Sequence, residues 1–122
     1  MKNKLTWFEI NVTDLERAKT FYQTVLGSEF TFVDMPEAPM YMFNADQESG
    51  EVGGALVKTN DNAPSNRGTV IYFGSQDVAI EATKVEPAGG KLLFPKTSIG
   101  DFGFIAHFID TEGNRIGLHS EK

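Results

Sequence analysis

Apolar and polar side chains alternate near the start of the chain. Over residues 4–12, Phe8 and Ile10 fall on one face of the segment, and Trp7 and Glu9 fall on the other. A repeat of two residues is typical of a β-strand that has one face in the core. We therefore predict a strand here, and we expect a helix to cover its apolar face.

The residues that follow have the spacing of that helix. Apolar side chains recur at intervals of three and four, at Leu15, Ala18, Phe21, Tyr22, Val25 and Leu26. Thr13 and Glu16 have the spacing of a capping box, in which each side chain binds a free backbone N–H at the helix start. Gly27 favours a helix end, because glycine tolerates the left-handed conformation found there. The pattern predicts a helix over residues 14–26.

The rest of the chain predicts more strands and a second helix. Apolar segments indicate strands at residues 29–34, 40–44, 51–57, 69–75, 91–95, 102–109 and 114–119. Residues 58–68 are polar and rich in Asn, Pro and Gly, which is typical of a linker. A helix is predicted over residues 77–86, with Ser75 or Asp77 as its cap. The two glycines within residues 96–103 indicate either a mobile flap or a fixed rim.

The second half of the chain repeats the order of elements in the first. Trp7 matches Val70, and Gly54 matches Gly117, 63 residues later in both cases. The shared order of strand, helix and three strands is stronger support for a repeat than these single matches.

This repeat predicts the fold class. The 122 residues fit a single domain, which we place at 1–122, with modules at about 4–57 and 69–120. We predict an α+β fold of two β-α-β-β-β modules, in which a curled mixed sheet surrounds a cleft. The cleft is expected on the sheet face that the helices leave free, because a concave and mostly apolar surface is the usual ligand site. The residues predicted to line it are Trp7, Glu9, Gly54, Leu56, Val70, Tyr72, Gly117 and His119.

Composition excludes several classes of function. The chain has 17 Asp and Glu residues against 11 Lys and Arg, which gives a net charge of −6. A protein that binds a nucleic-acid backbone carries a surplus of positive charge instead. The chain has no cysteine, so disulfides, thiol catalysis and cysteine-held metals are excluded. No apolar run approaches the ~18 residues typical of a membrane span. Without a signal peptide in the sequence, we expect a cytoplasmic protein with neither a nucleic-acid nor a membrane partner.

Four segments resemble the vicinal oxygen chelate superfamily, which includes glyoxalase I, extradiol dioxygenases, and fosfomycin and bleomycin resistance proteins. The segments are WFEINVTDLERAKTFYQTVLG, VIYFGSQDV, AGGKLLFPKT and DTEGNRIGLHS. The likeness spans about residues 5–120 and is greatest to short glyoxalase-related proteins. It implies the two-module fold and a homodimer, in which the modules are either swapped or not.

The resemblance also implies a divalent metal, held by one histidine or carboxylate from each of four strands. The positions that match this ligand set are Trp7, Gly54, Val70 and Gly117. None of these side chains offers a metal-binding atom, since the indole N–H only donates hydrogen bonds. We therefore expect no metal at the family position and no other cofactor.

The remaining chemical groups each have more than one possible role. Glu9 is the candidate catalytic group: it serves as a general base, anchors a cationic ligand group, or is a structural carboxylate. Trp7 either stacks on a ligand or fills the metal volume. Tyr72 is the repeat equivalent of Glu9, and a hydrogen bond from its hydroxyl to Glu9 would be either structural or functional. The orientation of His107 stays open.

The leading hypothesis is metal-independent binding of a small ligand, whose identity the sequence leaves open. The alternatives are a glyoxalase-like lyase or isomerase, with Glu9 as base or with a displaced metal, and a subunit that works only with another chain.

Overall fold

The computed structural model describes residues 3–122. The first module contains β1 (Trp7–Asn11), α1 (Leu15–Leu26), β2 (Phe30–Val33), β3 (Met40–Phe43) and β4 (Gly53–Val57). The second contains β5 (Tyr72–Gly74), α2 (Val78–Val85), β6 (Lys91–Ser98), β7 (Phe104–Ile109) and β8 (Arg115–Ser120). Short 3-10 turns occupy Gln47–Ser49 and Gly100–Phe102. In the segment predicted as a flap or a rim, residues 96–98 belong to β6 and the second of these turns follows.

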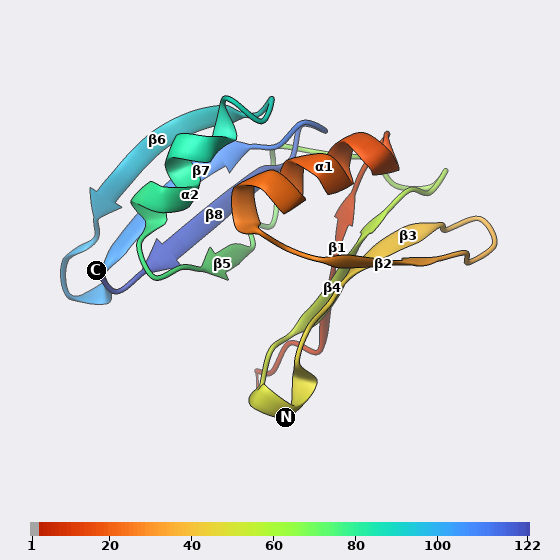
Figure 1. Ribbon diagram of the computed structural model, residues 1–122, viewed down its shortest axis with the longest axis horizontal. Helices are drawn as coiled ribbons and strands as arrows, with labels where there is room; N and C mark the ends of the chain where they lie inside the picture. Colours follow the sequence, from red (N-terminus) through yellow and green to blue (C-terminus); the bar gives the residue numbers. More distant parts are fainter. Residues whose placement is uncertain (1–2) are drawn as a thin grey trace.

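Each module forms a four-stranded mixed sheet. The strand orders are β1-β4-β3-β2 and β5-β8-β7-β6, so the two halves have the same topology (Figure 1). The first strand of each module pairs in parallel with the last, and the other neighbours are antiparallel. The predicted α+β class and the duplicated order of elements are confirmed. No helix within the described chain is long and apolar enough to cross a bilayer.

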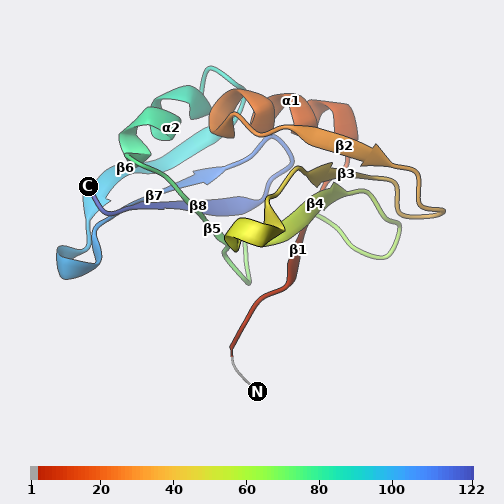
Figure 2. The ribbon, with the colours of Figure 1, turned by 60° about the horizontal axis from the view of Figure 1, so that its bottom comes forward.

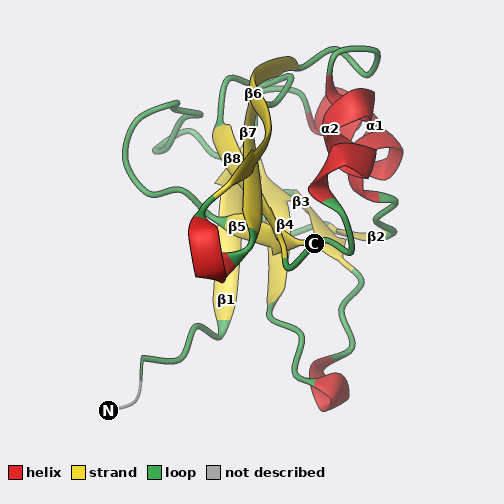
Figure 3. Cartoon of the chain, turned by 90° about the vertical axis from the view of Figure 1, so that its left-hand side faces the viewer, coloured by secondary structure: helices red, strands yellow, loops and turns green. Residues whose placement is uncertain are grey.

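The two helices lie together on one side of the strands (Figures 2 and 3). α1 packs against α2 and against β3 and β4, while α2 packs against β6, β7 and β8. The core between helices and strands is shared by both modules: Phe21 of α1 contacts the ring of Phe108 in β7, and Phe8 of β1 contacts Phe73 of β5. The strands therefore present their other side away from the helices, and we call this the open face.

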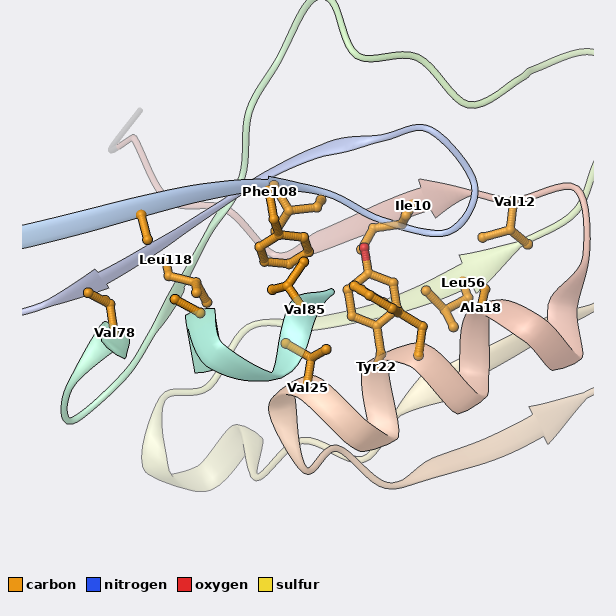
Figure 4. Packing of buried hydrophobic residues seen from close by; sticks show 14 residues of the cluster. Ile10, Val12, Ala18, Tyr22, Val25, Leu56, Val78, Val85, Phe108 and Leu118 are labelled. Carbon is orange, nitrogen blue, oxygen red and sulfur yellow. The ribbon is translucent and has the colours of Figure 1, made fainter. Parts of the chain in front are cut away.

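The register decides which side chains reach the open face. Glu9 pairs with Ala55, and Ile10 pairs with Leu56. Because paired residues of neighbouring strands point the same way, Leu56 lies on the helix side. It is fully buried there with Ile10 (Figure 4). The prediction that Leu56 lines the ligand site is therefore wrong.

Gly54 also lies on the helix side, where the ring of Phe8 covers it. Its assignment to the open face, and to the family's metal position, is wrong for the same reason. Glu9 and Tyr72 are the matching residues of β1 and β5, and Tyr72 pairs with Gly117. The first-module residue equivalent to Gly117 is therefore Ala55.

The start of α1 differs from the predicted capping box. Asp14 is the N-cap, and its side chain accepts a hydrogen bond from the backbone N–H of Arg17. Glu16 instead reaches the hydroxyl of Tyr41. The N-cap of the second helix is Asp77, one of the two predicted candidates.

Thr13 is held from the other module. A carboxylate oxygen of Glu112, in the turn between β7 and β8, accepts hydrogen bonds from the backbone N–H of Thr13 at 3.0 Å and of Asp14 at 2.9 Å. The hydroxyl of Thr13 and the guanidinium of Arg17 donate to the same carboxylate. A second link lies nearby, where the buried hydroxyl of Tyr22 donates to Asp110 at 2.6 Å. These bonds fix the turn of module two against the first helix of module one.

Candidate functional site

The predicted site residues line separate hollows on the open face instead of one cleft. A hollow of about 580 Å³ lies beside Trp7, Met42 and Gly53, and we call it the Trp7 hollow. A smaller one of about 250 Å³ lies where the modules meet and contains Glu9, Arg67 and Arg115; we call it the seam hollow. A third of about 480 Å³ is lined by Tyr72, Gly74, Ile99, Phe102, Ile105 and His119, and we call it the Tyr72 hollow.

Trp7 and Glu9 form a polar contact on the first module. They lie two residues apart on β1 and both point to the open face, as the alternation predicts. The indole Nε1 donates to Oε2 of Glu9 at 3.2 Å. Trp7 remains 40% exposed, and Glu9 is exposed as well. The second carboxylate oxygen of Glu9 can still accept from a bound molecule, and the indole ring offers a flat apolar surface beside it.

A longer chain of hydrogen bonds crosses the second module. His107 of β7 pairs with Gly117 of β8, so its side chain shares the open face with Tyr72. Its Nε2 lies 2.6 Å from the hydroxyl of Tyr72, and its Nδ1 accepts from Nε of Arg115 at 2.9 Å. The ring of Phe94 stacks on the imidazole, with centroids 4.7 Å apart. Burial lowers the pKa of His107, and the positive charge of Arg115 lowers it further.

The Tyr72 ring lies against β8 because Gly117 has no side chain. A Cβ atom at Gly117 would stand 2.4 Å from the ring. His119, two residues further along β8, points to the same face and lines the Tyr72 hollow. Its Nε2 lies 2.6 Å from the carbonyl oxygen of Phe102, which makes this nitrogen the donor. His119 thus holds the 3-10 turn that forms the wall of the hollow.

The structure places the remaining predicted residues as follows. Val70 is half-buried and precedes β5, so it stands beside the site without lining any of the three hollows. Tyr72 does not bond to Glu9 as predicted, since its partner is His107. Trp7, Glu9, Gly117 and His119 have the predicted orientation, and their use in binding stays a prediction.

Sequence reasoning missed Arg115 and the aromatic wall at Phe102. Arg115 has the same strand parity as Gly117 and His119 in the segment RIGLHS, so the alternation placed it on the open face. Phe102 is 78% exposed, which no sequence pattern indicated.

The residues present do not fit a divalent metal. The positions that would hold it carry Trp7, Ala55, Val70 and Gly117, and none of these side chains has an oxygen or imidazole donor. Within residues 3–122, no three His, Asp or Glu side chains come together in a way that could bind an ion. The nearby donors Glu9 and His119 are in different modules and different hollows.

Comparisons with known proteins agree with this fold. A family profile for the N-terminal region of bleomycin resistance-like proteins matches residues 4–44. The chain is 30% identical over 121 residues to a glyoxylase-like domain-containing protein of Didymella fabae, covering 93% of this chain and 91% of that one. It is also 27% identical over 114 residues to the Mycobacterium tuberculosis protein CFP32, which is named as a glyoxylase. The match covers 92% of this chain but 43% of CFP32. The chain thus spans less than half of that relative.

Solved structures show the same architecture. A glyoxalase I variant from Zea mays superposes with a TM-score of 0.75 at 24% identity, over 94% of this chain and 46% of the maize chain. The fosfomycin resistance protein FosX from Listeria monocytogenes also gives a TM-score of 0.75, at 15% identity, over 100% of this chain and 94% of its own. The chain belongs to the vicinal oxygen chelate superfamily, among its glyoxalase-like proteins.

Proposed function

We propose that this protein binds a small organic molecule on its open face without a metal ion. The observation that carries the proposal is the replacement of the superfamily's metal-binding side chains by Trp7, Ala55, Val70 and Gly117, while one hollow remains beside Trp7 and another beside Tyr72. These hollows lie next to the exposed aromatic rings of Trp7 and Tyr72, and concave, partly apolar surfaces of this kind support a binding role.

Each module contributes a different set of groups to such binding. Trp7 offers a flat apolar surface and Glu9 offers carboxylate oxygens, which suit a cationic or hydrogen-donating group. Tyr72 and His119 stand at the hollow of the second module, over the space that Gly117 leaves. Val70 precedes β5 and lines none of the three hollows, and Leu56 belongs to the core.

Metal analysis tests the proposal directly. We expect well below one equivalent of Ni, Zn, Mn or Fe per chain in the purified protein, and we expect ligand binding to survive a chelator. A screen of metabolites by thermal shift then identifies the ligand, since a ligand at 100 times its Kd stabilises the folded state by ~2.7 kcal/mol. Near-stoichiometric metal, or binding that a chelator abolishes and added metal restores, would overturn the proposal.

Glu9→Gln tests the role of the first module. We expect this variant to weaken binding of a cationic ligand from the screen, because the amide loses the negative charge while keeping the shape. Glu86→Gln is the matched control, since Glu86 is exposed at the end of α2 and far from the open face. Equal binding by the wild type and both variants would remove Glu9 from the site.

The glyoxylase names of the two relatives favour one alternative, a lyase or isomerase related to lactoylglutathione lyase. In that case Glu9 acts as the general base, or a metal binds at a displaced position. A lactoylglutathione lyase assay separates the two functions. We expect no turnover above background, whereas turnover that falls in Glu9→Gln but persists in Glu86→Gln would support the enzyme.

The proposal extends to assembly and location. We propose a cytoplasmic location. Exposed apolar side chains such as Trp7 favour a homodimer in which a second copy covers part of the open face. Light scattering at micromolar concentration should give twice the 13.5 kDa chain mass. A monomer would refute the dimer, and capture of a different chain at fixed stoichiometry would support a subunit of a mixed assembly.

A further inference from the structure

The hydrogen bonds from Arg115 to Tyr72 have a fixed direction. A guanidinium only donates hydrogen bonds, so Nδ1 of His107 must accept from Arg115 and carries no proton. The single proton of the neutral imidazole is therefore on Nε2, which donates to the hydroxyl oxygen of Tyr72. Burial beside the charge of Arg115 lowers the pKa of His107 and so supports the neutral ring.

This direction leaves the hydroxyl proton of Tyr72 available. The oxygen already accepts from His107, so its own O–H cannot point back along the same bond. Within residues 3–122, this oxygen has no other protein partner. Tyr72 is 49% exposed and lines the Tyr72 hollow. Its donor is thus free for a molecule that enters the hollow.

The position of the Tyr72 ring is constrained as closely as the direction of its bond. Gly117 allows the ring to lie on β8, and Phe94 stacks on the imidazole that holds the hydroxyl. A donor that is already oriented loses little freedom when it binds, which raises its contribution to affinity. Arg115 and His107 act through Tyr72 and are therefore positioning residues.

We propose that the Tyr72 hollow selects a flat, mostly apolar and uncharged molecule that carries one oxygen acceptor, such as an aryl ketone. The apolar walls are formed by Ile99, Phe102 and Ile105, and the volume of about 480 Å³ accommodates a single ring system. The oriented O–H of Tyr72 binds the acceptor oxygen. This inference rests on the proposed function, because it names the class of ligand for one of its hollows.

The first test requires no ligand. The ¹⁵N shifts of the His107 ring in the free protein distinguish a protonated Nε2 from a protonated Nδ1. We expect the proton on Nε2 in the wild type and a mixture of tautomers in Arg115→Met, which keeps an unbranched side chain as far as the position of Nε but has no donor. A proton on Nδ1 in the wild type would overturn the proposal.

The second test uses two probes of the same shape, acetophenone and α-methylstyrene, which differ by a carbonyl oxygen in place of a methylene group. Titrations followed at the methyl groups of Ile99 and Ile105 should show acetophenone binding about five-fold more tightly, as one net hydrogen bond provides. Tyr72→Phe should bring the two affinities together while changing that of α-methylstyrene less than two-fold. Arg115→Met should reduce the preference in part. Tyr41→Phe is the matched control and should leave it unchanged, because Tyr41 bonds to Glu16 instead.

The outcomes separate this inference from the proposed function. Equal affinities in the wild type, or a preference that Tyr72→Phe leaves intact, would overturn the inference alone. The same holds if neither probe shifts Ile99 or Ile105 while screened metabolites bind at the Trp7 hollow or the seam hollow. If no small molecule binds anywhere on the open face, both the inference and the proposed function fail.

Discussion

Glu112 joins the two modules, and its replacement by glutamine tests how strongly they are coupled. Its side chain is fully buried and accepts hydrogen bonds from the backbone of Thr13 and Asp14 and from the guanidinium of Arg17. Glu112→Gln keeps the size of the side chain but removes its charge. It also turns an amide NH₂ group toward donors that need an acceptor.

The magnitude of the effect follows from the pKa of Glu112. Burial alone raises this pKa, but the hydrogen bonds from Arg17, Asp14, Thr111 and Thr13 outweigh burial and bring it from 4.5 to about 2. A pKa lowered to this extent corresponds to about 3 kcal/mol of stability at neutral pH. The side chain of Arg17 is 51% exposed, so solvent screens part of its attraction. We expect Glu112→Gln to lose about 2–3 kcal/mol at pH 7.

The pH dependence gives this prediction its signature. Because the pKa is lower in the folded state, the stabilisation is complete above the unfolded value near 4.5 and is lost as the pH falls toward 2. Urea unfolding followed by circular dichroism at pH 7, 5 and 3 measures the free energy of unfolding for both proteins. The difference between wild type and variant should be nearly constant from pH 7 to pH 5 and smaller at pH 3.

Two results would refute the reasoning. A loss below about 0.5 kcal/mol at pH 7 is what an ordinary surface substitution gives, and it would mean that the buried carboxylate does not couple the modules. A difference that stays the same from pH 7 to pH 3 would mean that the loss comes from packing and not from charge. Glu86→Gln, at an exposed carboxylate, should change stability by less than 0.5 kcal/mol at each pH.

Two further predictions concern the faces of the sheets. Burial and the charge of Arg115 should keep the pKa of His107 below 6.5 in the folded state. The contribution of His107 to stability is therefore complete above pH 6.5, and part of it is lost as the pH falls toward the folded pKa. NMR titration should show a rise in this pKa in Arg115→Met, and an unchanged pKa would contradict the assigned contact. Gly54→Ala should destabilise the fold by about 1–3 kcal/mol, because its Cβ would stand 2.4 Å from the ring of Phe8. The control Gly74→Ala, with nothing within 4 Å, should be nearly neutral in thermal unfolding, and equal effects of both would contradict the register of β4.

The fold was predictable where alternation and polarity coincide. In β1, Phe8 and Ile10 alternate with Trp7 and Glu9, so the pattern determines which side faces the helices. In β4, the segment GGALV contains no polar residue, and all five positions are buried. Without polar residues, alternation cannot show which side chains share a face. The match of Gly54 with Gly117 between the two halves therefore assigned Gly54 to the wrong face. The true equivalent of Gly117 is Ala55, which only the strand register reveals.

The start of α1 was mispredicted for a different reason. The capping box is a local rule, and Thr13 and Glu16 satisfy it on sequence alone. In the folded chain, Glu112 binds the backbone N–H of Thr13 and of Asp14, which lie 99 and 98 residues away in the sequence. A buried carboxylate that binds two backbone donors and a guanidinium outweighs the local pair. A rule that considers only neighbouring residues cannot include Glu112, which is distant in the sequence.

The network at Tyr72 was partly accessible from sequence. The turn at residues 110–114 predicts a hairpin, and a hairpin brings His107 of β7 close to Arg115 of β8, as the register confirms. The contact between His107 and Tyr72 depends on the parallel pairing of β5 with β8, which joins segments more than 40 residues apart. Parallel pairing leaves no local signal, so the partner of Tyr72 was wrongly assigned to Glu9.

The repeat explains why the two modules differ in what they can bind. Glu9 and Tyr72 occupy equivalent places in β1 and β5, and each accepts a hydrogen bond from a ring N–H, from Trp7 in one case and from His107 in the other. A carboxylate that accepts one bond can only accept more, whereas a phenol that accepts one bond still has a proton to donate. The same arrangement therefore gives an acceptor in the first module and a donor in the second. A single molecule that spans both would need a hydrogen-donating or cationic group at Glu9 and a carbonyl at Tyr72, and the separate effects of Glu9→Gln and Tyr72→Phe on its binding should then add.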